Sequence, residues 1–288
     1  MLKRIALITA VAILGVTGTA VADPIVLPGD TPLYIKFDNV EQVSTLGLAG
    51  GDILVPGGAH GTADNWGVFS VTTIDLGNVV DPNVNIGPTG SPAEYYNGTQ
   101  GSIYGIFYDI ILTSTTTAIG GKLDLWWSDA VGAVNLATAN DDAATVAAFT
   151  SGTFLAQLLF EPGINANIGD CTTTIDSDSD PTTVGGSGRA DSFASVNLAA
   201  GGAWASVLDG NWFITGCGVH DVRFSNFFTQ DRLDWNGPDL NGDGIPDQLG
   251  LNSSDPARVF TNPIPEPATL TLLGLGLAGL GYRRRRRA

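Results

Sequence analysis

The stretch IYGIFYDIILTST, residues 103–115, decides the fold class. It is dense in β-branched and aromatic residues, and turn-forming residues precede it in NIGPTGSP, residues 85–92. Short runs of this composition between turn residues are typical of β-strands, whereas an amphipathic helix places apolar residues every three to four positions. The sequence therefore predicts a β-strand at 103–115.

Segments of the same kind recur along the chain, separated by Gly, Pro, Asn and Asp. Long amphipathic helical windows are missing between them, so a parallel α/β architecture is disfavoured. We predict an all-β fold, a single β-sandwich or jelly-roll-like domain. The expected strands are residues 33–40, 66–76, 103–115, 122–129, 152–161, 191–199, 211–219 and 221–229.

One segment, NDDAATVAAFTSG at 140–152, favours a helix. Asn140 or Asp141 can cap its first turn, because a side-chain oxygen there accepts from a free backbone N–H group. Alanine-rich residues follow, and alanine has the highest helix propensity. We expect one short helix on a loop of the β-domain.

The N-terminus has the pattern of a secretory signal peptide. Lys3 and Arg4 precede an apolar run over 5–16, and the small residues Ala20 and Ala22 frame a cleavage site before Asp23. Charge, apolar core and small-residue site in this order are typical of a leader that signal peptidase removes. Residues 1–22 are therefore predicted to be absent from the mature protein.

The C-terminus combines a Pro-Glu-Pro triplet, an uncharged run over 268–280 and an arginine cluster. As a helix, the run reaches roughly 20 Å, less than the hydrocarbon core of about 30 Å. The arginines are expected to stay on the cytoplasmic side. A short anchor helix of this length would span the membrane only marginally. The residues of the signal are Pro265, Glu266, Pro267, Arg283, Arg284, Arg285, Arg286 and Arg287.

The triplet, the Gly/Leu-rich run and the terminal arginines together resemble the PEP-CTERM sorting signal of Gram-negative bacteria. The resemblance implies recognition by an exosortase, a membrane cysteine transpeptidase-like enzyme. It also implies a chain held transiently in the inner membrane, processed near the triplet, and passed to the cell surface or an exopolysaccharide matrix. The similarity covers about 25 of the 288 residues and says nothing of the middle of the chain.

These ends divide the chain into a signal peptide (1–22), an exported β-rich domain (23–251), a polar linker (252–263) and the sorting signal (264–288). Seven of the 13 basic residues and one of the 29 acidic residues lie in the two ends. The mature chain keeps six basic and 28 acidic residues, a net charge near −22. A surface this acidic repels nucleic acid and anionic lipid, so nucleic acid is excluded as a partner.

The two cysteines of the chain are Cys171 and Cys217. Thiols in an exported chain most simply pair, because the compartment is oxidising. The bridge would close a loop of about 47 residues and stabilise the fold by about 4 kcal/mol on the chain-entropy model. A catalytic cysteine is disfavoured, since His60 and His220 are the only histidines that could act as its base.

The segment DLNGDGIPD, residues 239–247, carries the best local motif. Calcium takes six to eight oxygens, and alternate residues of a tight turn converge on one point. The pattern resembles the calcium loops of EF-hands, dockerins and thrombospondin type 3 repeats, with Gly244 at the bend. Gly250 replaces the acid at position twelve, so affinity is weak or needs a ligand such as Asp234. A solvated turn without an ion is the alternative. The predicted structural ligands are Asp239, Asn241, Asp243, Ile245 (through its carbonyl) and Asp247.

The segments GGKLDLWWSDA and SGTFLAQLLFEPG have a loose similarity to PEP-CTERM proteins associated with flocculation. The strand pattern, the acidic mature surface and the lack of a catalytic constellation favour an exported, non-catalytic surface or extracellular-matrix protein. The similarity favours a role for it in biofilm, exopolysaccharide or floc formation. One alternative is a carbohydrate-binding module that stacks sugars on exposed tryptophans such as Trp126 or Trp127. A less favoured alternative is a secreted polysaccharide hydrolase, because no catalytic motif of known type is found in the sequence.

Overall fold

The computed structural model describes residues 24–47, 50–77 and 93–261. Strands make up 47% of the structure and helices 11%, which confirms the all-β class. The predicted signal peptide and the predicted anchor helix of the tail lie outside the described residues. Within the described part, no helix has the length and apolarity needed to cross a membrane.

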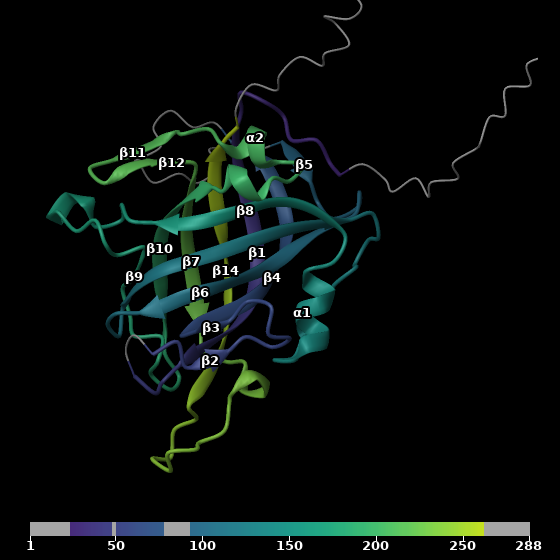
Figure 1. Ribbon diagram of the computed structural model, residues 1–288. Coiled ribbons are helices and arrows are strands. Elements are labelled where there is room, and N and C mark those ends of the chain that lie inside the picture. The colour runs from purple at the N-terminus through teal and green to yellow at the C-terminus, as the bar shows by residue number, and fades with distance from the viewer. Residues whose placement is uncertain (1–23, 48–49, 78–92, 262–288) are drawn as a thin grey trace, which may run out of the picture.

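Eight long strands form the body of the structure (Figure 1). They are β1 (Pro32–Ser44), β4 (Asn65–Leu76), β6 (Ser102–Leu112), β7 (Thr117–Ser128), β8 (Thr153–Glu161), β10 (Ser187–Val196), β13 (Val222–Thr229) and β14 (Gln248–Phe260). The short strands are β2 (Ile53–Leu54), β3 (Thr62–Ala63), β5 (Glu94–Tyr96), β9 (Ile175–Ser177), β11 (Phe213–Thr215) and β12 (Gly218–His220). The helices are α1 (Ala143–Phe149) and α2 (Ala205–Leu208), with 3-10 turns η1 (Leu136–Thr138), η2 (Ala166–Ile168), η3 (Leu198–Ala200) and η4 (Leu233–Trp235).

The long strands form one antiparallel sheet that closes on itself. Its order is β1-β14-β13-β10-β8-β7-β6-β4, and β4 pairs again with β1. The predicted sandwich or jelly roll is therefore corrected to a closed eight-stranded barrel. Closure pairs every long strand on both sides and so leaves no unpaired edge among them.

Local irregularities let the sheet curve. The β1–β4 register shifts between Lys36 and Phe37, and the β7–β8 register shifts between Leu125 and Trp126. Gly105 lies where a Cβ atom would stand 1.8 Å from the carbonyl oxygen of Asp124 on the neighbouring strand. Bulges and a glycine at a close backbone approach are the usual means of bending a sheet into a barrel.

Apolar residues gather in two clusters on opposite sides of the barrel wall. The interior cluster takes alternate residues of the long strands, including Phe37, Phe69 and Phe224. The outer cluster lies between the wall and α1, η4 and the β2–β3 pair, with Trp66 and Trp235 fully buried and their ring centroids 5.3 Å apart. Each strand near α1 is therefore buried on both faces.

The two ends of the barrel are built differently. At the closed end, where β1 begins and β14 ends, the Trp204 indole and Leu208 of α2 cover the interior; Trp204 Nε1 donates to the carbonyl oxygen of Ile25 over 2.7 Å. At the open end, β6 ends, β7 begins and β9 joins the wall. Figure 1 shows α2 at the first end and the 239–247 loop beyond the second.

Several sequence predictions need correction in detail. The expected linker at 252–263 is, as far as Phe260, part of β14, which pairs with β1 along its whole length. The expected strand at 211–219 is the hairpin β11–β12. The predicted helix is present as α1, but Asp142 caps it rather than Asn140 or Asp141, and its Oδ1 accepts from Thr145 N over 2.7 Å.

Candidate functional site

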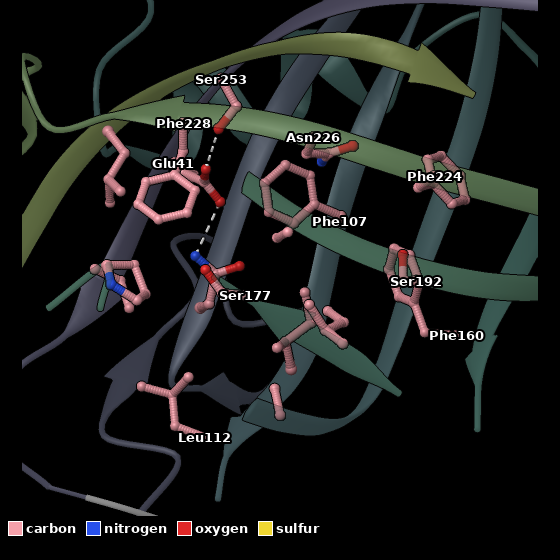
Figure 2. Close-up of a pocket in the computed structure, with 18 of the residues that line it drawn as sticks. Glu41, Phe107, Leu112, Phe160, Ser177, Ser192, Phe224, Asn226, Phe228 and Ser253 are labelled. Atoms are coloured by element: carbon pink, nitrogen blue, oxygen red, sulfur yellow. Dashed lines mark hydrogen bonds between the residues drawn. The ribbon is translucent and has the colours of Figure 1, made fainter. Parts of the chain in front are cut away.

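A cavity of about 100 Å³ lies inside the barrel toward its open end (Figure 2). Inward-facing side chains from most of the long strands line it, because successive residues of a strand point to opposite faces. The lining is mainly apolar, and Phe107, Phe160 and Phe228 form much of its wall. An eight-stranded barrel has an interior that side chains just fill or that holds one small ligand.

Glu41 of β1 brings a carboxylate to this apolar wall. Its Oε2 accepts from Asn65 Nδ2 over 3.0 Å, and its Oε1 accepts from the Ser253 hydroxyl (Figure 2). Burial raises the pKa of the Glu41 carboxyl above its usual value, and hydrogen bonds from Ser253, Asn65 and Asn39 oppose the shift. Burial of an ionisable group is costly unless hydrogen bonds compensate it.

Two more acceptors lie in the same region. Asn226 lines the cavity, and its buried Oδ1 has no hydrogen-bond partner among the described residues; the same holds for Asn39 Oδ1, two positions before Glu41 on β1. Buried polar atoms are paired in most proteins, so unpaired acceptors call for an explanation. The open end thus offers hydrogen-bond acceptors at an apolar surface.

Two strands, β8 and β9, pair one after the other with β10 and complete the wall beside the cavity. β8 pairs with residues 193–196 of β10, with Glu161 opposite Phe193, and β9 pairs with residues 190–192. Ile175 and Ser177 of β9 line the cavity. The chain leaves the barrel between β8 and β9 and then returns, so the position of β9 depends on how this excursion is held.

The disulfide holds that excursion. Cys171 and Cys217 are bonded, with their Cα atoms 5.3 Å apart, which confirms the predicted bridge. Cys217 lies between β11 and β12, so the bond ties the segment before β9 to this hairpin. The pairing therefore has a local effect on the cavity wall in addition to its entropic effect on the unfolded chain.

A histidine network next to the disulfide was not expected from the sequence. His220 Nδ1 lies 3.1 Å from Glu161 Oε2, and its Nε2 lies 3.1 Å from Thr215 Oγ1. This connectivity is that of an acid–base–hydroxyl triad. His220 is 2% exposed and stacks on Phe193, and the Thr215 hydroxyl also bonds to the Gly218 carbonyl. These contacts are consistent with a structural role in which His220 links the β11–β12 hairpin to the barrel wall.

The predicted calcium loop adopts the tight turn that its sequence indicates. Asp239 accepts from Gly242 N and Gly244 N, at 2.7 and 2.9 Å, and Gly244 has a positive φ of 88°. Asn241 Oδ1 accepts from Asp243 N. An occupied loop and a solvated turn share these bonds, so calcium binding stays a prediction.

The rest of the predicted ligand set is only partly brought together. Asp247 is 2% exposed; its Oδ2 accepts from Leu240 N over 3.0 Å, and its Oδ1 is buried without a partner in the described chain. Asp243 Oδ1 accepts from Ile245 N. In residues 24–47, 50–77 and 93–261, no three His, Cys, Asp or Glu side chains are grouped closely enough to hold a metal ion.

Packing explains the missing acid at position twelve. A Cβ atom on Gly250 would lie 2.1 Å from the Arg232 carbonyl oxygen, so no side chain fits there. Asp234, considered as a replacement ligand, instead bonds Arg232 through both oxygens at 2.9 Å. Hydrogen bonding to Arg232 lowers the pKa of Asp234. Position twelve of the loop therefore has no carboxylate, and the Asp234 carboxylate is bound by Arg232.

The tryptophans bear on the carbohydrate-binding alternative. Trp66, Trp127, Trp204 and Trp235 are buried, at most 3% exposed. Trp126 and Trp212 are half-buried, and Trp126 packs edge-on against Phe154 on the outer wall. Sugar stacking on Trp127 is therefore excluded by its position in the interior, and the alternative would depend on Trp126 or Trp212.

Comparison with protein families matches residues 263–287 to the PEP-CTERM protein-sorting motif. The chain carries a PEP-CTERM sorting signal. The motif implies processing by an exosortase and a secreted, membrane-transiting protein. The signal residues predicted from the sequence, Pro265 to Pro267 and Arg283 to Arg287, fall within the match but outside the described residues. No curated protein and no solved structure matches the chain.

Proposed function

We propose that this PEP-CTERM protein is a non-catalytic component of the cell surface or extracellular matrix. The observation that carries the proposal is the sorting motif at 263–287, directly after a disulfide-bonded barrel. The acidic mature chain, with a net charge near −22, is suited to solubility outside the cell. The barrel is then the part of the protein that acts after export, and the tail is the means of delivery.

The finer role that we propose is in exopolysaccharide-rich material, that is, in biofilm or floc formation. Support comes from the sorting route and from the loose similarity of GGKLDLWWSDA and SGTFLAQLLFEPG to flocculation-associated proteins. Signal peptidase and exosortase are the processing partners, and exopolysaccharide is the structural partner. The inner membrane is a transient location, and the surface or matrix is the final one.

Replacing Pro265, Glu266 and Pro267 together by alanine tests the delivery step. The variant should accumulate in the membrane fraction with its arginines attached, while the natural protein appears outside without them, as mass spectrometry of the C-terminal peptide would show. Pro238→Ala, at a proline outside the motif, is the matched control and should be exported normally. Normal release of the triple variant would contradict the proposal.

The matrix role needs a separate test. Deleting the gene for this protein from the producing strain should reduce floc or biofilm mass, and reintroducing the gene should restore that mass. A deletion strain that aggregates normally while still exporting other PEP-CTERM proteins would contradict the matrix role and leave the sorting route intact.

A further inference from the structure

We propose that the open-end cavity binds one compact, mainly apolar molecule that carries a single hydrogen-bond donor, an alcohol or an amine, with Glu41 as its polar anchor. This goes beyond sorting and matrix location, because it assigns a ligand to the exported barrel itself. The inference rests on the shape of the interior, on its mainly apolar lining, and on the Glu41 carboxylate and the unpaired Asn226 amide oxygen in that lining.

The lining fits an apolar body of ring size. Aromatic and aliphatic side chains such as Phe107, Leu112 and Phe228 surround about 100 Å³ of space. A closed apolar cavity of about 150 Å³ in another protein binds benzene, so a space of this order at an opening accommodates one ring. Larger lipids and sugars do not fit without rearrangement of the wall.

Two polar groups of the lining have acceptor capacity that the protein does not use, the Glu41 carboxylate and the Asn226 amide oxygen. Glu41 accepts hydrogen bonds from Ser253, Asn65 and Asn39, and the two oxygens of a carboxylate together offer about four acceptor positions. Asn226 Oδ1 in the same lining is unpaired. A ligand hydroxyl or ammonium group supplies the missing donor, whereas a ligand carboxylate would meet the Glu41 charge at low dielectric and be repelled.

The interior is not loosely built throughout. Toward the closed end, the space between Ile35, Leu158 and Trp204 is about 30 Å³ and has no polar lining atoms exposed to it. The same barrel therefore packs well at one end and leaves a larger space at the other, where Glu41 and Asn226 are among the lining residues. Burying Glu41 and Asn226 costs stability, and a bound donor would offset that cost.

The experiment uses four probes of similar size: benzyl alcohol, benzylamine, toluene and benzoate. Binding to the exported protein is measured by titration calorimetry and by ligand-observed NMR. We expect the alcohol or the amine to bind at least about tenfold more tightly than toluene, the effect of one charge-assisted hydrogen bond, and benzoate to bind least. Equal binding of toluene, or failure of both donor-bearing probes to bind, would overturn the proposal.

Two variants test whether the probe binds in the cavity. Glu41→Gln should weaken the preferred probe by about tenfold, because the carboxylate charge is lost. Ala190→Leu fills the lining from β10 and should abolish binding of all four probes, whereas Ala199→Leu, at an exposed residue of η3, should leave binding unchanged. Circular dichroism and urea melts establish that each variant is folded. Unchanged binding in folded Ala190→Leu would place the probe elsewhere and overturn the assignment.

Discussion

The closed end and the open end of the barrel solve the same packing problem in different ways. At the closed end, Trp204 and Leu208 from outside the sheet fill the interior, and the remaining space is small and apolar. At the open end, the interior keeps a larger space and holds Glu41 and Asn226. The tighter apolar packing is therefore at one end, and the larger space with polar lining groups is at the other.

The sharpest test of this comparison uses one substitution at each end. Leu208→Ala at the closed end should lower the free energy of unfolding by about 4 kcal/mol, because a tightly packed site leaves a new cavity. Leu112→Ala at the open end should cost about 2 kcal/mol, since it enlarges an existing space. Urea unfolding of both variants measures the difference. Equal costs would mean that the two ends are packed alike.

Removing the disulfide should loosen the open end selectively. The variant with both Cys171→Ser and Cys217→Ser should lose about 4 kcal/mol of unfolding free energy. Amide exchange should accelerate most at β9, because the excursion before it is no longer tied to the β11–β12 hairpin. Exchange at the β1–β14 ladder serves as the internal control. Uniform acceleration across the barrel would show that the bond acts only through the unfolded chain.

The charge at Glu41 should make the open end sensitive to pH. Its pKa is raised in the folded protein from a reference value of 4.5, so its contribution to stability is fully present below that pH and is lost as pH rises through the folded pKa. The stability of the natural protein relative to Glu41→Gln should fall over this range, by about 1.4 kcal/mol for each pH unit that separates the folded pKa from the unfolded pKa. Urea melts at several pH values give the difference, and a flat profile would contradict it.

The calcium prediction concerns the loop beyond the open end and has the smallest expected effect. Calcium at ten times its dissociation constant should raise the free energy of unfolding by about 1.4 kcal/mol, and chelator should reverse the change. Asp247→Asn should remove the response, while Asp129→Asn, at an exposed carboxylate elsewhere, should keep it. A thermal melt that calcium and chelator leave unchanged favours the solvated turn.

Local sequence predicted the strands but not the way in which they join. Segments such as 103–115 carry enough β-branched and aromatic residues to be recognised as strands. Closure depends on β1 pairing with both β4 and β14, and pairing between segments so far apart leaves no local signal. The linker prediction failed at β14 because Asn252, Ser253 and Ser254 interrupt its apolar residues, although Leu249, Leu251 and Val259 are buried.

The candidate sites show the same limit. The disulfide followed from composition and compartment alone, and the turn of the 239–247 loop followed from its glycines. Glu41 was missed, although it lies in phase with Leu33, Ile35 and Phe37 on β1, which is a signal for an inward carboxylate. The sequence pattern also did not predict that Trp204 fills the interior at the closed end, because the segment around Trp204 has no strand pattern.

The pairing of β1 with β14 brings the first and last strands of the barrel together at one end. Pro32 lies opposite Phe260, and Thr261 exchanges backbone hydrogen bonds with Asp30 and Thr31, so the chain enters and leaves the barrel at the plugged side. The sorting motif begins at residue 263, two positions beyond Thr261. The sorting motif therefore follows a strand that ends at the plugged side, and the cavity lies toward the opposite end of the barrel.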